Sequence, residues 1–139
     1  MTDPGGDETG ERNDPFTVPI GDVQPSQPLL NGRKLSLAAQ WFDFDDPEYD
    51  PIPVVEYEGA LIPTDGHTRA FVAYLAGSDE LVVRHDDDDL PMALYGRCVE
   101  YTREAGVTSV GDLAGRVVNA AAFEEQWVAR CEAAAEDLD

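Results

Sequence analysis

A polar hexapeptide, Thr64–Arg69, carries the side chains best suited to chemistry in this chain. The segments on either side predict where it lies. The stretch 54–62 has strand character on both sides of a Glu58-Gly59 turn, and the stretch 70–77 has apolar residues at helical spacing. The hexapeptide is therefore predicted to be a strand-to-helix turn. The first N–H groups of such a helix are unpaired and lie at the positive end of the helix dipole, which suits a phosphate.

Several residues of this turn fit a phosphate site. Gly66 lets the backbone approach a ligand closely, Arg69 offers a planar fork of donors to phosphate oxygens, and His67 can exchange a proton near neutrality. A structural interpretation is equally open. In that interpretation Asp65 only caps the helix and Gly66 only permits the turn. The side chains of His67 and Arg69 are then exposed polar groups.

The segment Asp65–Arg69, with the sequence Asp-Gly-His-Thr-Arg, precedes an Ala- and aromatic-rich stretch that ends in Leu-Ala-Gly. This combination resembles the signature of the ParB/sulfiredoxin-like superfamily. ParB proteins have a Gly-Glu-Arg-Arg type box here, sulfiredoxins have Gly-Cys-His-Arg, and the free serine kinases of this fold have Asp-Gly-His-His-Arg. Gly66 and Arg69 match the glycine and the final arginine of these boxes.

The resemblance continues in the same order from about Val18 to His85. It includes a first strand, a Pro-containing loop at 23–27, Lys34 at the start of a helix, and a strand that opens at Pro51. The resemblance implies a nucleotide cofactor, which is ATP, ADP or CTP with Mg²⁺. It also implies the residues of the site. The phosphate-binding residues would be Gly66, Thr68, Arg69, Lys34, Ser26 and Gln27, and Asp65 or His67 would position Mg²⁺ or a proton. For Lys34, a solvated surface lysine is the alternative.

Two departures from the family pattern bear on catalysis. The catalytic cysteine of sulfiredoxins corresponds to His67, so sulfinic-acid reductase chemistry is not expected. The serine kinases use a Glu as the base in the loop after the first strand, where this chain has Gln24–Gln27, and a glutamine cannot take a proton. Asp22 or Asp65 could substitute for that base. Whether the chain is an enzyme therefore stays open.

Three classes of function remain. The first is a nucleotide-binding module, with phosphoryl transfer to a small molecule or nucleotide hydrolysis as an extension, because such chemistry depends mostly on positioning and charge. The second is a non-enzymatic ParB-like adaptor that binds a partner and is linked to chromosome or plasmid partition. The third is a purely structural acidic domain. The expected partners are the nucleotide and a small-molecule substrate, and a homodimer is left open.

The charge of the chain is extreme. Its 139 residues include 29 Asp and Glu against nine Lys and Arg, which gives a net charge of −20. Acidity of this kind is typical of proteins from salt-in halophiles, in which carboxylates keep the surface hydrated. Direct DNA binding is disfavoured, because the chain has no basic stripe to neutralise phosphates. The run Asp86–Asp89 has ligands suited to Mg²⁺, but we interpret it as solvated charge with Asp89 capping the next helix, and we predict no metal site.

The pattern predicts an α+β fold, with a small mixed β-sheet and helices followed by a C-terminal helical extension. We expect residues 1–14 to be a disordered acidic tail, residues 15–89 to form the ParB/sulfiredoxin-like domain, and residues 90–139 to form the extension packed on it. Neither a signal peptide nor a membrane-spanning run is evident, which predicts a cytoplasmic protein.

Helices are expected at 33–42, from 91 to near 106, at 109–113 and at 120–135, and a strand at 81–85. The side chains expected to be buried are Trp41, Phe71, Leu75, Tyr95 and Trp127. The two cysteines, Cys98 and Cys131, fall in separate predicted helices without a CxxC partner. We interpret them as distant, reduced and buried thiols.

Overall fold

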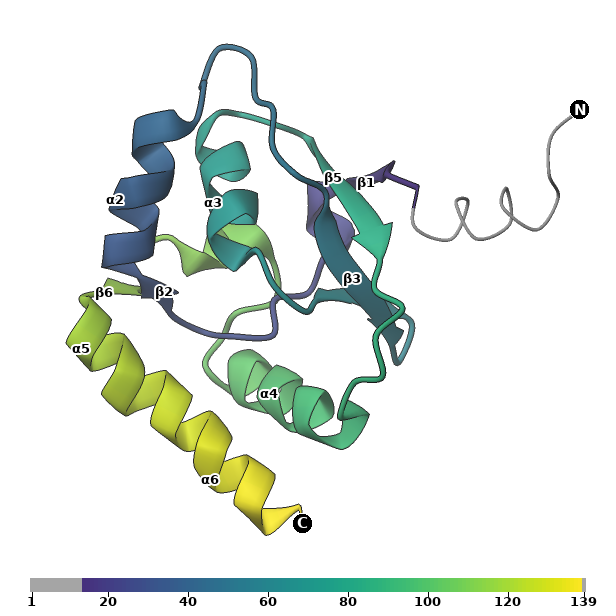
Figure 1. Cartoon of the computed structure of the whole chain (residues 1–139), viewed down its shortest axis with the longest axis vertical. Helices are drawn as coiled ribbons and strands as arrows, with labels where there is room; N and C mark the ends of the chain where they lie inside the picture. The colour runs from purple at the N-terminus through teal and green to yellow at the C-terminus, as the bar shows by residue number, and fades with distance from the viewer. Residues whose placement is uncertain (1–13, 139) are drawn as a thin grey trace, which may run out of the picture.

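The computed structural model describes residues 14–138, and the fold is α+β, as predicted (Figure 1). The main sheet is mixed, with strand order β1-β5-β3-β4; β5 lies antiparallel to β1 and parallel to β3. Its strands are β1 (Phe16–Pro19), β3 (Ile52–Tyr57), β4 (Ala60–Pro63) and β5 (Glu80–His85). Apart from Asp14, the tail predicted at 1–14 lies outside the described residues.

Strands β3 and β4 form the predicted hairpin, and they place the polar hexapeptide. Glu58 and Gly59 both have positive φ, at 50° and 81°, as a two-residue hairpin turn of type I′ requires. Val54 pairs with Pro63 at the open end of the hairpin, and the N–H of Thr64 donates to the carbonyl of Pro53 at 2.9 Å. The hexapeptide therefore leaves the sheet from a fixed position.

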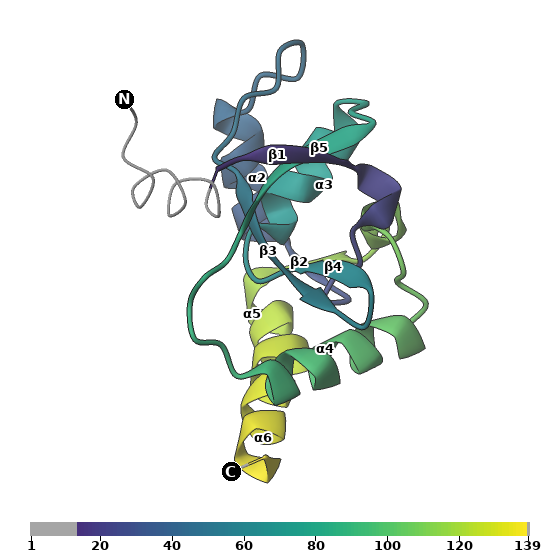
Figure 2. The ribbon, with the colours of Figure 1, turned by 90° about the vertical axis from the view of Figure 1, so that its right-hand side faces the viewer.

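Two helices cover one face of the sheet. Helix α2 (Gly32–Trp41) and helix α3 (His67–Leu75) pack against each other, and Figure 2 shows both on the same side of β3 and β5. The buried face of α3 includes Phe71 and Val72, which join the sheet residues Val54 and Val83 in one apolar core. Since α3 is held by this core, its first turn is presented at a defined edge of the molecule.

The C-terminal part is joined to the first part through a second, two-stranded sheet. Its strands β2 (Leu30–Asn31) and β6 (Val117–Val118) are parallel, and the sequence pattern had not indicated either. The helical elements here are α4 (Met92–Glu104), a 3₁₀ turn (Val110–Leu113), α5 (Ala120–Phe123), a π-helical turn (Glu124–Val128) and α6 (Ala129–Asp137). The last three form one continuous C-terminal helix that lies beside α4 in Figure 1.

The burial of the large side chains differs in part from the expectation. Phe71 and Trp127 are buried, as predicted, and Tyr95 is half-buried. Trp41 and Leu75 are exposed at 56% and 53%, so their predicted burial was wrong. At the end of α2 the core position is taken by the C-cap residue, Phe42, which is buried.

The start of α4 also differs from the expectation. The cap position belongs to Pro91, which makes no side-chain capping bond, and Asp89 lies too early to cap the helix. The carbonyl of Pro91 accepts the N–H groups of Leu94 and Tyr95, so the first turn begins only after the proline. No helix in the described part of the chain is both long enough and apolar enough to cross a membrane.

Candidate functional site

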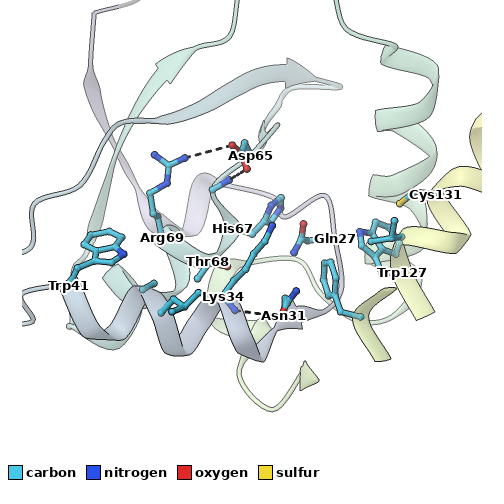
Figure 3. A pocket seen from close by; sticks show the side chains of 15 residues that line it. Gln27, Asn31, Lys34, Trp41, Asp65, His67, Thr68, Arg69, Trp127 and Cys131 are labelled. Atoms are coloured by element: carbon cyan, nitrogen blue, oxygen red, sulfur yellow. Dashed lines mark hydrogen bonds and ion pairs between the residues drawn. The ribbon is translucent and has the colours of Figure 1, made fainter. Parts of the chain in front are cut away.

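A groove of about 540 Å³ runs between α2, the turn before α3 and the C-terminal helix (Figure 3). Seven of the eight residues predicted for the site line it. These are Gln27, Lys34, Asp65, Gly66, His67, Thr68 and Arg69. The eighth, Ser26, lies behind the groove and contacts His67. The packing of α2 against α3 therefore brings residues from three separate segments of the sequence around one hollow.

Gly66 is the cap residue of α3 and is needed there for two reasons. Its φ of 81° is left-handed, and a Cβ atom at this position would lie 2.8 Å from Nη2 of Arg69. Its N–H donates to Oδ1 of Asp65 at 2.8 Å, while no side chain caps the helix. The N–H groups of the first turn are thus left at the positive end of the helix dipole, beside the groove.

Arg69 is positioned but retains unused donors. Its Nη1 donates to the carbonyl of Asp50 at 2.8 Å, and its Nη2 lies 4.0 Å from Oδ2 of Asp65. The Asp65 side chain is 80% exposed, so this ion pair is weak. Arg69 lines both the groove and a second hollow, to which Tyr49 and Asp50 also contribute. It can therefore donate to a ligand without losing the contact that holds it.

His67 does not fit the role predicted for it. The ring is buried, and its Nε2 accepts the N–H of Ser26 at 2.9 Å, which leaves the ring proton on Nδ1. Burial lowers the pKa of His67 to about 4, against a weaker opposing effect of Asp65. The imidazole is consequently neutral at physiological pH, and the expectations of a near-neutral pKa and of an exposed side chain were both wrong. Its interaction is with the loop at 23–27, which it fastens to α3.

The loop at 23–27 has further fixed contacts. Oγ of Ser26 donates to the carbonyl of Pro63 at 2.7 Å. Gln24 is buried, where its Nε2 donates to the carbonyl of Val107 at 3.0 Å and its Oε1 accepts Nε of Arg103 at 3.3 Å. The buried amide of Gln24 thus holds the loop to the segments that contain Val107 and Arg103.

Lys34 is the only lysine in the chain. Asn31 caps α2 by accepting the N–H groups of Arg33 and Lys34 at 2.9 and 3.4 Å, which fixes the helix start. Figure 3 shows the Lys34 side chain extending from α2 toward the turn before α3. Within residues 14–138 its ammonium has no ion-pair partner. An ammonium group without an ion-pair partner in the described part of the chain therefore lies at the groove.

The acidic run does not form a metal centre. Oδ2 of Asp86 accepts Oγ1 of Thr64 at 2.5 Å, and Oδ1 of Asp86 accepts the N–H of Asp88 at 2.9 Å, so this carboxylate is used in a turn. Across the described residues no three His, Cys, Asp or Glu side chains are grouped to hold a metal ion. A Mg²⁺ ion in the groove would need phosphate oxygens among its ligands.

Sequence reasoning missed the aromatic part of the site. Trp41, Phe123 and Trp127 all line the groove, whereas both tryptophans were predicted only as core residues. A signal for Trp41 was present, because Lys34, Leu37 and Trp41 follow one another at helical spacing and so share a face of α2. No local pattern in the sequence indicated that residues of the C-terminal helix would line the same groove as the turn before α3.

Comparisons with known proteins give little further information. No family model matches the chain, and no curated protein matches it. Among solved structures, the protein Atu1540 from Agrobacterium tumefaciens is similar to this chain, with 14% sequence identity and a TM-score of 0.46. The match covers 71% of this chain and 60% of Atu1540. The chain thus spans about three fifths of that protein, and a likeness this distant carries no functional argument.

Proposed function

We propose that this chain binds a nucleotide in the groove, with the phosphates at the first turn of α3 and Lys34 and Arg69 as their cationic partners. The observation that supports this most directly is the convergence of three kinds of phosphate ligand on one hollow. They are the N–H groups of the first turn of α3, which no side chain caps, the ammonium of Lys34, which has no ion-pair partner among residues 14–138, and the donors of Arg69 beyond its bond to Asp50. The same residues are the ones that the ParB/sulfiredoxin-like resemblance implies.

The local charge supports an anionic ligand. The chain as a whole has a net charge of −20, yet the groove is lined by two cations, Lys34 and Arg69, and by one carboxylate, Asp65. A polyphosphate is repelled by the overall charge of the chain and attracted by Lys34 and Arg69. Bound Mg²⁺ lowers the negative charge of the polyphosphate. Short-range attraction of this kind persists in concentrated salt better than the long-range repulsion does.

The aromatic lining favours a nucleotide over inorganic phosphate. The ring of Trp41 is 56% exposed at one part of the groove, and Phe123 contributes a half-buried ring from the C-terminal helix. A flat base can cover such apolar surface, whereas a phosphate ion gains nothing from it. The volume of about 540 Å³ lies within the usual range for a small-molecule site.

The groove favours binding over catalysis. His67 is neutral and engaged, and the loop at 23–27 has no carboxylate. Among the described residues Asp65 is the one carboxylate that lines the groove, so we propose it as the base if phosphoryl transfer or nucleotide hydrolysis takes place there. The second candidate function is a partner-binding adaptor. It is supported by the exposed apolar side chains Leu37, Trp41 and Phe44, at 53%, 56% and 41% exposure.

The test is a thermal-shift panel of ATP, ADP, CTP and GTP, each with Mg²⁺ in molar KCl, with pyrophosphate as a further ligand. A ligand that binds only the folded state adds about 2.7 kcal/mol at a hundredfold excess over its Kd. We expect at least one nucleotide to raise the melting temperature by several degrees and pyrophosphate to raise it less. A flat response to all four nucleotides at millimolar concentration would contradict the proposal.

A matched pair of variants locates the site. Lys34→Gln removes the groove ammonium, and Arg33→Gln removes the same charge from the preceding residue, which is exposed and does not line the groove. The nucleotide-dependent shift should be lost or strongly reduced in Lys34→Gln and retained in Arg33→Gln. Equal reduction in the two variants would show a general charge effect and would argue against phosphates beside Lys34.

A further inference from the structure

The two cysteines of the chain lie in contact. Cys98 is on α4 and Cys131 is on α6, and their sulfur atoms are 3.9 Å apart, although 33 residues separate them in the sequence. The interpretation of these residues as distant thiols was therefore wrong. Cys98 is buried, while Cys131 is partly exposed and lines the groove. A small oxidant in the groove thus has a path to this pair of thiols.

The surrounding contacts hold the two helices together at this point. The ring of Trp127 meets the ring of Tyr101 edge-on, with centroids 6.4 Å apart. The guanidinium carbon of Arg130 lies 3.7 Å from the centroid of the same tyrosine ring. These contacts come from residues next to the cysteines on both helices. Bond formation requires the sulfurs to close from 3.9 Å to about 2.05 Å, a change on the scale of side-chain rotation.

The two thiols are chemically unequal. The hydrogen bond between the two thiols lowers the pKa of Cys98, burial acts in the opposite direction, and the positive charge of Arg130 lowers that pKa further. The same hydrogen bond raises the pKa of Cys131, with burial as the next contribution. Contact between the two thiols therefore favours the thiolate form of Cys98, while the partly exposed Cys131 is the thiol that meets the groove.

We propose that Cys98 and Cys131 form a reversible dithiol–disulfide pair that tethers the C-terminal helix to α4. That helix also carries Phe123, Trp127 and Val128, which line the groove, so the disulfide fixes one wall of the groove. The disulfide can form whether or not the groove binds a nucleotide. Only the effect of the disulfide on ligand access to the groove rests on the proposed nucleotide binding.

The oxidant is a peroxide, and the reaction balances with it. The thiolate of one cysteine attacks one peroxide oxygen, the O–O bond breaks, and hydroxide leaves, which gives a sulfenic acid on that cysteine. The sulfur of the second cysteine then attacks the sulfenic sulfur, and the hydroxyl group leaves with the proton of the second thiol as water. The hydroxide takes up the proton released by the first thiol. Two thiols and one peroxide thus become one disulfide and two waters.

The test uses the full-length reduced protein and hydrogen peroxide, without a nucleotide. We expect the intact mass to fall by two hydrogen atoms, both thiols to become unreactive to iodoacetamide after denaturation, and a peptide map to show Cys98 linked to Cys131. A disulfide that closes a 33-residue separation should raise the melting temperature by on the order of 10 °C. Dithiothreitol should reverse every change.

The single variants Cys98→Ser and Cys131→Ser serve as controls, because neither should lose two hydrogens or gain thermal stability with peroxide. Three results on the wild-type protein would overturn the proposal, so it stays testable if a variant misfolds. The first is addition of oxygen atoms without loss of hydrogen, and the second is formation of disulfide-linked dimers in place of the internal bond. The third is an internal disulfide that leaves the melting temperature unchanged, which would rule out the tether.

Discussion

Arg69 is the residue at which the binding and the structural interpretations of the turn differ most. Its guanidinium donates to the Asp50 carbonyl and lies 4.0 Å from an exposed Asp65 carboxylate, so it already contributes to the turn. Arg69→Lys keeps the charge but loses the planar fork that contacts two phosphate oxygens. A charge-assisted hydrogen bond is worth about 1.5–3 kcal/mol, so we expect nucleotide affinity to fall roughly tenfold or more while the fold survives.

The measurement is a fluorescence titration of wild type and Arg69→Lys with the most stabilising nucleotide, and a thermal melt of each protein. Both tryptophans of the chain line the groove, so their emission reports directly on its occupant. Equal affinities combined with a lower melting temperature would assign Arg69 to a purely structural role with Asp50.

His67 makes the stability depend on pH in a defined window. Burial lowers its pKa from the ordinary value of 6.5 to about 4 in the folded protein, so from pH 6.5 downward the unfolded chain binds a proton that the folded chain does not. The stabilisation is fully present above pH 6.5 and is lost progressively as the pH falls to about 4, by about 3 kcal/mol in total. In His67→Gln this loss should be absent.

Urea unfolding of wild type and His67→Gln between pH 7 and pH 4 checks this expectation. The difference between the two curves removes the contribution of the many carboxylates, which both proteins share. A difference curve that is flat over this range would show that the histidine is not held neutral by the fold.

At the scale of secondary-structure elements, the cap residue of α3 affects both the backbone conformation at the helix start and the position of Arg69 in the site. Gly66 and Gly77 lie just outside the two ends of α3 and have φ values of 81° and 87°. An alanine at either position incurs the left-handed strain, about 1–2 kcal/mol. At Gly77 a Cβ has open space, but at Gly66 it would displace the Arg69 guanidinium.

We therefore expect Gly66→Ala and Gly77→Ala to lower the free energy of unfolding by similar amounts, while only Gly66→Ala weakens nucleotide binding. Chemical denaturation and the fluorescence titration measure the two effects separately. Loss of binding in both variants would point to α3 as a whole, and retention in both would remove the Gly66–Arg69 contact from the site.

The elements that could be predicted from the sequence are those with local signals. The β3–β4 hairpin follows from its Glu58-Gly59 turn, and the 3₁₀ turn at Val110 follows from Ser109, whose capping box with Asp112 is present. Strands β2 and β6 could not be predicted, because two residues have no periodicity and their pairing depends on contacts far apart in the chain. The π-helical turn in the C-terminal helix likewise has no sequence signature that we could identify.

For the site, the turn itself was predictable and its surroundings were not. The residues Asp65–Arg69 form one local motif, whereas the position of Lys34 beside them depends on how α2 packs on α3. The same limit explains why the predicted burial of Trp41 was wrong. At the end of α2, a shift of one residue in the buried face decides whether a side chain lies in the core, as Phe42 does, or in the groove, as Trp41 does. It also explains the Cys98–Cys131 contact, which requires the C-terminal helix to lie along α4.

At the scale of the whole molecule, the net charge of −20 is the dominant feature. Like charges at this density repel one another in the compact state, and salt screens that repulsion over a Debye length that shrinks from about 30 Å at 0.01 M to about 3 Å at 1 M. We expect the melting temperature to rise between dilute and molar KCl. Each kcal/mol of stabilisation corresponds to roughly 3–6 °C for a chain of this size. An unchanged midpoint would contradict halophilic adaptation.

The most direct test of a nucleotide in the groove is an amide proton–nitrogen NMR titration of the ¹⁵N-labelled chain with the Mg²⁺ complexes of ATP, ADP, CTP and GTP. If phosphates bind at the first turn of α3, the amide signals of residues 66–69 should move most. Those of α2 around Lys34 should move as well, while signals from β1, at the edge of the sheet opposite β4, should stay in place. An unchanged spectrum with all four nucleotides at millimolar concentration, or shifts confined to residues away from the groove, would contradict nucleotide binding at this site.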